Sequence, residues 1–134
     1  MAGPFDNPFG LSALSLPLRE QRLKVLASNL ANADTPGFKA QDLDFRAALD
    51  GAVARQRSVG TGASGSGVSI IGGGAPDFRR YVTTRDATQP SLDGNTVNGD
   101  TEHAAFGRAV LEYRASLTFF ESRVRGLMTA ITGQ

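Results

Sequence analysis

The chain has 134 residues, a formal net charge of +1 and no cysteine, with 40% hydrophobic and 20% charged residues. This length leaves room for one domain, and the lack of cysteine excludes disulfides, thiolate metal sites and cysteine nucleophiles. The balanced charge argues against nucleic acid and anionic membranes as partners, because both favour a basic excess clustered on one face. The apolar residues crowd into 5–49 and 104–131. A compact single core is therefore not expected.

The first 18 residues contain no basic residue, whereas a secretory signal opens with a positively charged stretch. Two early prolines and Asp6 interrupt the apolar run, which falls short of the length of a membrane span. We therefore expect no direct lipid span, and we expect any export to proceed without a cleaved Sec-type signal.

Residues 1–36 are predicted to form an N-terminal helical segment with two apolar stripes. One stripe follows a heptad spacing, and the other is offset around the helix; they contain Leu16, Leu23, Leu26, Leu30 and Ala33, and Leu11, Leu14, Leu18 and Val25. Two stripes on one helix indicate more than one packing partner. Pro17 removes a helical hydrogen bond and clashes with the preceding turn, so a kink or break is expected there.

The end of this segment carries two asparagines and a turn motif, which consist of Asn29, Asn32, Thr35, Pro36, Gly37 and Phe38. Pro36 disfavours helical geometry at Thr35, so the helix is expected to stop before it. Pro-Gly suits a type II turn because glycine accepts a positive φ. The two asparagines are three residues apart and are expected to share a helix face. Their amides can then bond the backbone of a loop that folds back on the helix end.

Residues 37–98 are predicted to be an extended or irregular middle. Within 58–76, eleven of nineteen residues are glycine or serine, which is typical of a flexible segment. Residues 78–85 are rich in aromatic and β-branched side chains and predict one short strand.

A second motif precedes the last helix and contains Pro90, Leu92, Asp93, Gly94, Asn95 and Val97. Its spacing is superficially similar to that of a calcium loop that begins at Asp93. Such a loop requires a ligand, a glycine and a glutamate where this chain has Val97, Asn98 and Ala104. We therefore interpret Asp-Gly-Asn as a turn that leads the chain into the helix.

Residues 99–134 are predicted to contain a helix from about residue 99 to 132, with Asn98 or Thr101 as its cap and Gly133 after its end. Its apolar residues repeat at steps of four and three, which is typical of a helix that supercoils against a partner. This seam consists of Phe106, Val110, Tyr113, Leu117, Phe120, Val124, Leu127 and Ile131. The helix would be about 50 Å long, which suits a rod better than a compact domain. The heptad positions of both helices are predicted to be helix-packing and subunit-interface residues.

The stretch from Asn29 to Phe38 resembles the signature of the bacterial flagellar rod, hook and filament-linking proteins. Segments 39–45 and 90–98 narrow the resemblance to the proximal rod members, and the resemblance covers about 16–49 and 88–132. The expected fold is mainly α. Long N- and C-terminal helices pair as a coiled-coil-like helical rod domain, with an irregular Gly/Ser-rich middle and a short β element. Together the three segments are expected to form one axial core domain.

The resemblance implies a structural subunit of the basal-body rod, which crosses the periplasm, transmits motor torque and joins the rod base to the next segment. It implies export in unfolded form through the flagellar type III apparatus. The implied partners are further copies of the chain, the axial proteins FliE, FlgC and FlgF, the export gate and the basal-body ring. No cofactor is implied.

An enzyme and a generic adaptor are the alternatives. The single histidine, His103, has no second histidine or cysteine to complete a metal or catalytic set, so no catalytic or metal-ligating residue is assigned. Periodicity alone does not exclude a two-helix coiled-coil adaptor unrelated to flagella. The turn that follows Asn29 and Asn32 distinguishes a rod protein from such an adaptor, because an adaptor does not need this turn.

Overall fold

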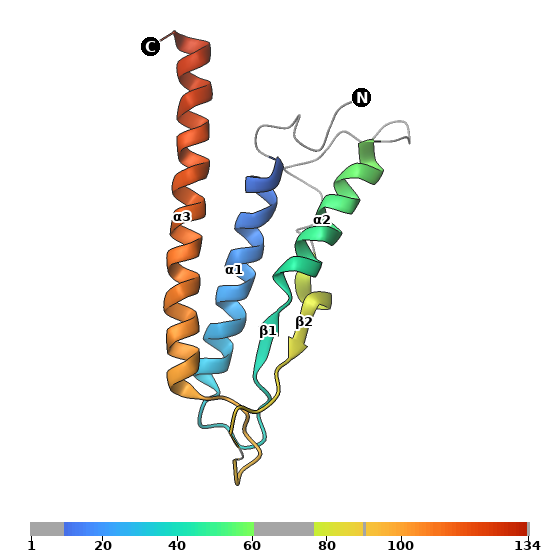
Figure 1. Ribbon diagram of the computed structural model, residues 1–134, viewed down its shortest axis with the longest axis vertical. Helices are drawn as coiled ribbons and strands as arrows, with labels where there is room; N and C mark the ends of the chain where they lie inside the picture. Colours follow the sequence, from blue (N-terminus) through green and yellow to red (C-terminus); the bar gives the residue numbers. More distant parts are fainter. Residues whose placement is uncertain (1–9, 61–76, 90, 134) are drawn as a thin grey trace.

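The computed structural model describes residues 10–60, 77–89 and 91–133. Its elements, in chain order, are α1 (Gly10–Ala31), β1 (Gln41–Leu43), α2 (Phe45–Gly60), the 3-10 helix η1 (Phe78–Tyr81), β2 (Val82–Thr84) and α3 (Gly99–Thr132). Helix α3 forms one long side of the molecule, and α1 lies between α3 and α2 (Figure 1). The predicted mainly α fold is confirmed.

The start and end of α3 match the prediction from the sequence. The Asn98 side chain accepts a hydrogen bond from the Thr101 backbone N–H at 3.1 Å, so Asn98 is the N-cap. Gly133 adopts a left-handed conformation with φ 73°, and its N–H bonds the Thr129 carbonyl at 2.8 Å. Both ends of the helix are therefore capped by local sequence, as expected.

We expected a kink or a break at Pro17. The helix does not break there, because α1 remains helical from Gly10 to Ala31 with Pro17 inside. A proline in a helix interior costs about 3 kcal/mol, so tertiary packing must offset the loss. Leu18, the next residue, is fully buried against Leu43, Ala48 and Phe78. This core contact holds the helix together on the carboxyl side of the proline.

The prediction of an irregular middle is wrong for residues 45–60, which form α2. Its buried side follows a helical spacing, in which Phe45 and Leu49 are half-buried and Ala48 and Ala52 are buried. Asp44 caps the helix by accepting a hydrogen bond from the Ala47 N–H at 2.9 Å. The prediction of a flexible segment over 58–76 is wrong for residues 58–60, which belong to α2. The remainder, 61–76, lies outside the described residues.

The strand expected over 78–85 is present only in part. Residues 78–81 form η1, which is capped by Asp77, and only Val82–Thr84 are extended. Strand β2 pairs antiparallel with β1, with Gln41 opposite Thr84 and Leu43 opposite Val82. A Cβ at Gly51 would clash with the Tyr81 hydroxyl, so α2 packs closely on η1 because residue 51 has no side chain.

Helices α1 and α3 pack antiparallel, and two contacts fix their register. The Asn29 side chain bonds Glu102, and Arg19 pairs with Glu112 at 2.6 Å, so ten residues back along α1 correspond to ten residues forward along α3. In this register Gly10 lies opposite Glu121. Residues 122–132, which we call the overhang, therefore extend beyond the start of α1 (Figure 1). That the pair supercoils stays a prediction.

Candidate functional site

The heptad seam of α3 lies on the side that packs on α1. Seven of its eight predicted residues are half-buried, and the eighth, Ile131, is 84% exposed at the end of the overhang. On α1, Leu26 is fully buried, whereas Leu16, Leu23 and Leu30 are half-buried. The seam therefore packs within the chain near the end of the helix pair where α1 ends and α3 begins. We call this end the base. Its role as a subunit interface stays a prediction.

Asn29 is fully buried and joins three elements at the base of the pair. Its Nδ2 donates to the Gln41 carbonyl at 2.7 Å and to Glu102 Oε2 at 3.0 Å. Its Oδ1 accepts from the Gln41 N–H at 3.0 Å. The predicted bonding of a returning loop is thus confirmed for Asn29, which extends the hydrogen bonding of β1 onto α1.

Asn32 does not share this role. It is half-buried, and its Nδ2 donates to the Ser28 carbonyl of its own helix at 2.8 Å. Its Oδ1 accepts from the Thr35 hydroxyl at 3.2 Å. The two asparagines were expected to act together on a returning loop, but Asn32 instead closes the end of α1 locally.

A chain of charged side chains continues from Asn29. Glu102 is fully buried at the start of α3 and pairs with Arg85, which follows β2. Arg85 also lies 4.0 Å from Asp42 of β1, and Asp42 pairs with Arg22 of α1 at 3.3 Å. We call these four residues with Asn29 the base network. A buried carboxylate requires such partners, because desolvation strongly disfavours an isolated charge.

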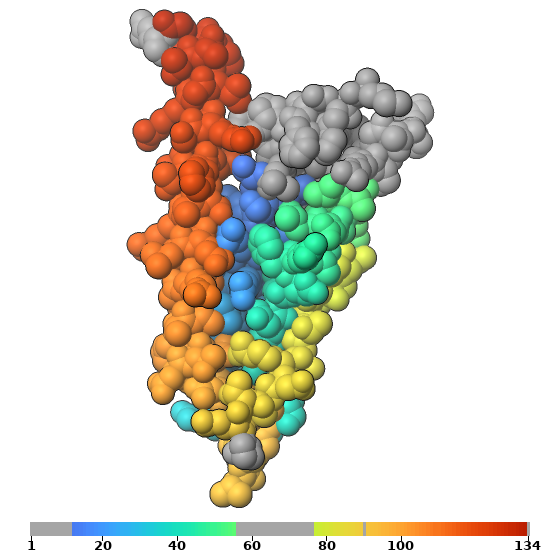
Figure 2. All heavy atoms as spheres, viewed as in Figure 1, coloured from blue at the N-terminus to red at the C-terminus, as the bar shows by residue number. Residues whose placement is uncertain are grey.

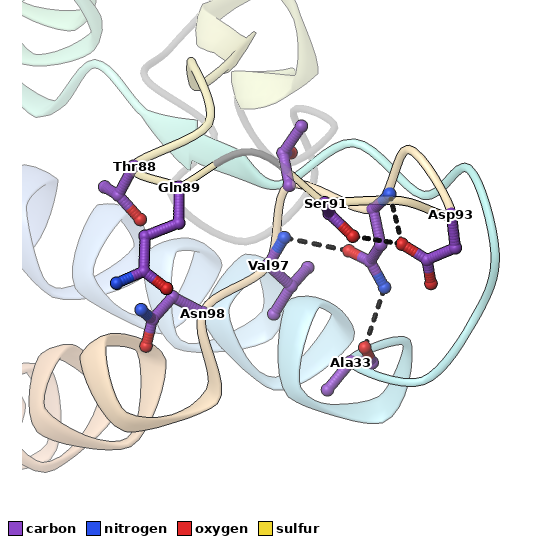
Figure 3. Close-up of a pocket in the computed structure, with 9 residues that line it drawn as sticks. Ala33, Thr88, Gln89, Ser91, Asp93, Val97 and Asn98 are labelled. Carbon is purple, nitrogen blue, oxygen red and sulfur yellow. Dashed lines mark hydrogen bonds between the residues drawn. The ribbon is translucent and has the colours of Figure 1, made fainter.

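The second motif holds the turn that follows α1 through Asn95. Its buried side chain donates from Nδ2 to the carbonyls of Asn32, Ala33 and Thr35 at 3.1, 2.7 and 3.0 Å. The bond to Ala33 is drawn in Figure 3. All three carbonyls lie in the turn after Ala31, the last residue of α1. Asn95, 60 positions beyond Thr35, therefore anchors the turn that follows α1.

The two motif loops interlock through their backbones. The Phe38 N–H bonds the Thr35 carbonyl at 3.2 Å, and Gly37 has φ 72°, as expected for the predicted turn. The Gly37 N–H bonds the Asp93 carbonyl at 2.9 Å, and the Thr96 N–H bonds the Phe38 carbonyl at 3.0 Å. Each loop therefore holds the other in place, which links the end of α1 to the approach to α3.

A polar hollow of about 320 Å³ lies beside these loops (Figure 3). Its lining is mainly hydroxyls and amides, from Ala33, Thr88, Gln89, Ser91, Asp93, Asn95, Thr96, Val97 and Asn98. Hydrogen bonds from the Ser91 hydroxyl and the Asn95 N–H lower the pKa of Asp93 below its ordinary value. Within the described ranges no three His, Asp or Glu residues are placed to hold a metal ion.

Sequence reasoning missed the four charged residues of the base network. Arg22, Asp42, Arg85 and Glu102 look like solvated surface charges, since no spacing along the chain pairs them with one another. Glu102 in the first turn of a helix has an adequate local explanation in the helix dipole. The single signal for its burial is its position on the seam side of the helix, four residues before Phe106.

These features describe a structural protein built on a long antiparallel helix pair. Hydrogen bonds and ion pairs hold the two helices together at the base of the pair. Residues 9–39 match the family described as flagella basal body rod protein. No helix in the part of the chain that the structure describes is both long and apolar enough to cross a bilayer.

Three relatives cover nearly the whole chain, and each is named flagellar basal body rod protein FlgB. The protein of Aeromonas hydrophila is 41% identical over 135 residues, which cover 100% of this chain and 99% of the relative. That of Cereibacter sphaeroides is 42% identical over 130 residues, with 97% and 98% covered. That of Yersinia enterocolitica is 38% identical over 136 residues, with 98% of each chain covered. The chain therefore belongs to the FlgB family of flagellar basal body rod proteins.

Proposed function

We propose that the chain is a structural subunit of the proximal rod in the bacterial flagellar basal body. In this role α3 packs against helices of neighbouring subunits. The observation that carries the proposal is the exposure of α3: of its 34 residues, only Glu102 and Ala109 are buried. A helix in water obtains most of its stability from a buried face. A helix this long with so little burial therefore needs neighbours.

The face of α3 turned away from α1 is where such neighbours fit. It carries Leu111, Ala115, Phe119 and Ser122 at steps of four, four and three, and we call these residues the outer face. Leu111 and Phe119 are 69% and 70% exposed. Burying one such side chain contributes roughly 1.5–3 kcal/mol, so repeated contacts along a polymer would give a tight joint.

The bonded base of the helix pair suits a subunit that transmits torque. The base network and the interlocked loops tie α1, β1 and α3 together, so a load on α3 passes to the rest of the subunit without hinging at the turn. Helix α3 is about 50 Å long and lies along the long axis of the molecule (Figure 2). Each subunit can therefore span several neighbours along the rod.

The partners proposed are further copies of the chain, the rod-base protein FliE and the rod proteins FlgC and FlgF. The export gate and the basal-body ring are proposed to contact the assembled rod, which lies in the periplasm. We propose export through the flagellar type III apparatus without a cleaved Sec signal. A chain without cysteine passes through such a route with no disulfide to reduce. The relatives' names favour this role over a generic two-helix adaptor.

The outer face supplies the test. Replacing Leu111 and Phe119 together with arginine is expected to abolish swimming, while the purified monomer keeps its helical circular dichroism and melting temperature. Loss of two apolar contacts of roughly 1.5–3 kcal/mol each weakens association by more than about a hundredfold. Motility in soft agar and recovery of rods from purified basal bodies are the measurements.

The matched control is Ala54→Arg, which adds an arginine at an exposed position of α2. This variant is expected to swim normally, because the added charge lies away from α3. Normal swimming of the double arginine variant, with intact rods, would show that the outer face is not an interface.

A further inference from the structure

The apolar seam of α3 continues onto the overhang. Val124 and Leu127 are half-buried there, and Met128 and Ile131 are 59% and 84% exposed. Steps of three and four separate Val124, Leu127 and Ile131, so these side chains lie on the side of α3 that packs on α1 nearer the base. Because the described helix α1 begins only at Gly10, none of its residues lies opposite this strip.

The nine residues that precede α1 are joined to it at the point where this strip begins. They lie outside the described residues, and their sequence is MAGPFDNPF. Because α1 and α3 are antiparallel, the chain that enters Gly10 starts at the level where the overhang starts. Nine residues span about 14 Å as a helix and up to about 30 Å when extended. The overhang is about 16 Å long, so segment 1–9 can reach along it.

Two phenylalanines in this segment continue the heptad spacing of α1. Phe9 lies seven residues before Leu16, and Phe5 lies four residues before Phe9. Arg19 belongs to the same heptad, three residues after Leu16, and its guanidinium pairs with Glu112 of α3 at 2.6 Å. The heptad side of α1 therefore faces α3, and its continuation carries both phenylalanines toward the overhang.

The prolines of the segment are compatible with this continuation. Proline inside a helix removes one hydrogen bond and clashes with the preceding turn. Helix α1 nevertheless contains Pro17 and remains helical, and Pro8 places the same demand on the continuation. Pro4 suits the first turn of a helix, where no such bond is lost.

We propose that residues 1–9 form a strap that packs along the seam side of the overhang of the same chain. Phe5 and Phe9 then cover Val124, Leu127 and Met128. The chain's own segment is the occupant because a tethered segment meets the strip at a far higher effective concentration than a free partner does. This contact lies within one subunit and does not depend on the proposed rod function.

The strap alone does not hold the overhang closed. Burying two phenylalanine rings returns less free energy than the conformational entropy of ordering nine residues costs. The strap therefore opens and closes in the isolated chain, and the amides of the overhang still exchange there. Neighbouring subunits complete the cover in the rod.

The absence of native cysteine allows a direct test with the full chain. One double variant carries Phe5→Cys and Met128→Cys, and its matched control carries Phe5→Cys and Thr129→Cys. Thr129 is also exposed, but it lies seven residues after Ser122 and so on the outer side of α3. Each dilute purified chain is oxidised, and the disulfide-closed monomer is followed on a non-reducing gel. The first variant is expected to close about tenfold faster than the control.

A second pair of substitutions tests the rings themselves. Adding Phe9→Ser to the first variant should slow closure severalfold, whereas adding Asn7→Ser should leave the rate unchanged, because residue 7 lies on the opposite side of the continuation. Equal rates for the first variant and its control, no closed monomer, or no effect of Phe9→Ser would overturn the proposal. A disulfide-linked dimer in place of the closed monomer would also overturn it, since a second copy would then be the occupant.

The measurement needs no assembled rod, so its outcome is separable from that of the rod proposal. The variant with arginine at 111 and 119 is expected to close at an unchanged rate, since both positions lie outside the overhang. If closure shows no preference for position 128 while that variant still blocks rod assembly, the strap proposal fails and the rod proposal stands.

Discussion

Asn29→Ala is expected to lower the free energy of unfolding by roughly 3–5 kcal/mol, because it leaves buried polar groups without partners. The Gln41 carbonyl and N–H lose their bonds to the amide, and Glu102 Oε2 loses its donor. Urea unfolding followed by circular dichroism gives the measurement. Unfolding should shift to lower urea with little change in slope, as for a variant with the same fold.

Asn32→Ala is the matched control, since it makes the same substitution three residues along the same helix. It removes bonds to Ser28 and Thr35 at a site that water reaches, so the expected loss is under about 1 kcal/mol. The contrast is the informative quantity. Equal losses for the two variants would contradict the role assigned to Asn29.

Glu102→Ala is expected to destabilise the fold by roughly 3–5 kcal/mol, as when one partner of a buried ion pair is removed. Arg85 loses its closest carboxylate, and the Asn29 amide loses one acceptor. Thermal unfolding of the purified chain measures the loss. The start of α3 should also become less protected from amide exchange, because Glu102 joins that end to β1 and α1.

Two comparisons isolate the buried network. Glu121→Ala, on the exposed part of the same helix, should change stability by no more than about 0.5 kcal/mol. The double variant of Asn29 and Glu102 should lose less than the two single losses combined, because the residues share one hydrogen bond. Additive losses would mean that the two side chains act independently.

Features specified by adjacent residues could be predicted from the sequence. The cap at Asn98, the stop at Gly133 and the turn at Gly37 each depend on a few neighbouring positions. The heptad spacing placed α3 within its observed limits because a helix of 34 residues gives many repeats of its period. The bonding of a returning loop by Asn29 also followed, since the helix stop and the buried amide lie close together in the chain.

Features that depend on distant contacts could not be predicted in this way. Helix α2 has a short apolar pattern that leads into a glycine- and serine-rich stretch, and its buried side is recognised only once Phe78 and Leu18 pack on Ala48. The helix survives Pro17 because of that same core. The base network brings together charges up to 80 residues apart, from Arg22 to Glu102, and no local pattern marks them.

The proposed role requires that α3 becomes fully packed only when neighbouring subunits cover it. Amide hydrogen exchange measures this most directly. In a dilute monomer, residues 122–132 should exchange rapidly, whereas amides near Glu102 and Ala109 should be protected. In assembled rods the overhang should become as protected as the base. Strong protection of residues 122–132 in the dilute monomer, unchanged on assembly, would contradict the claim.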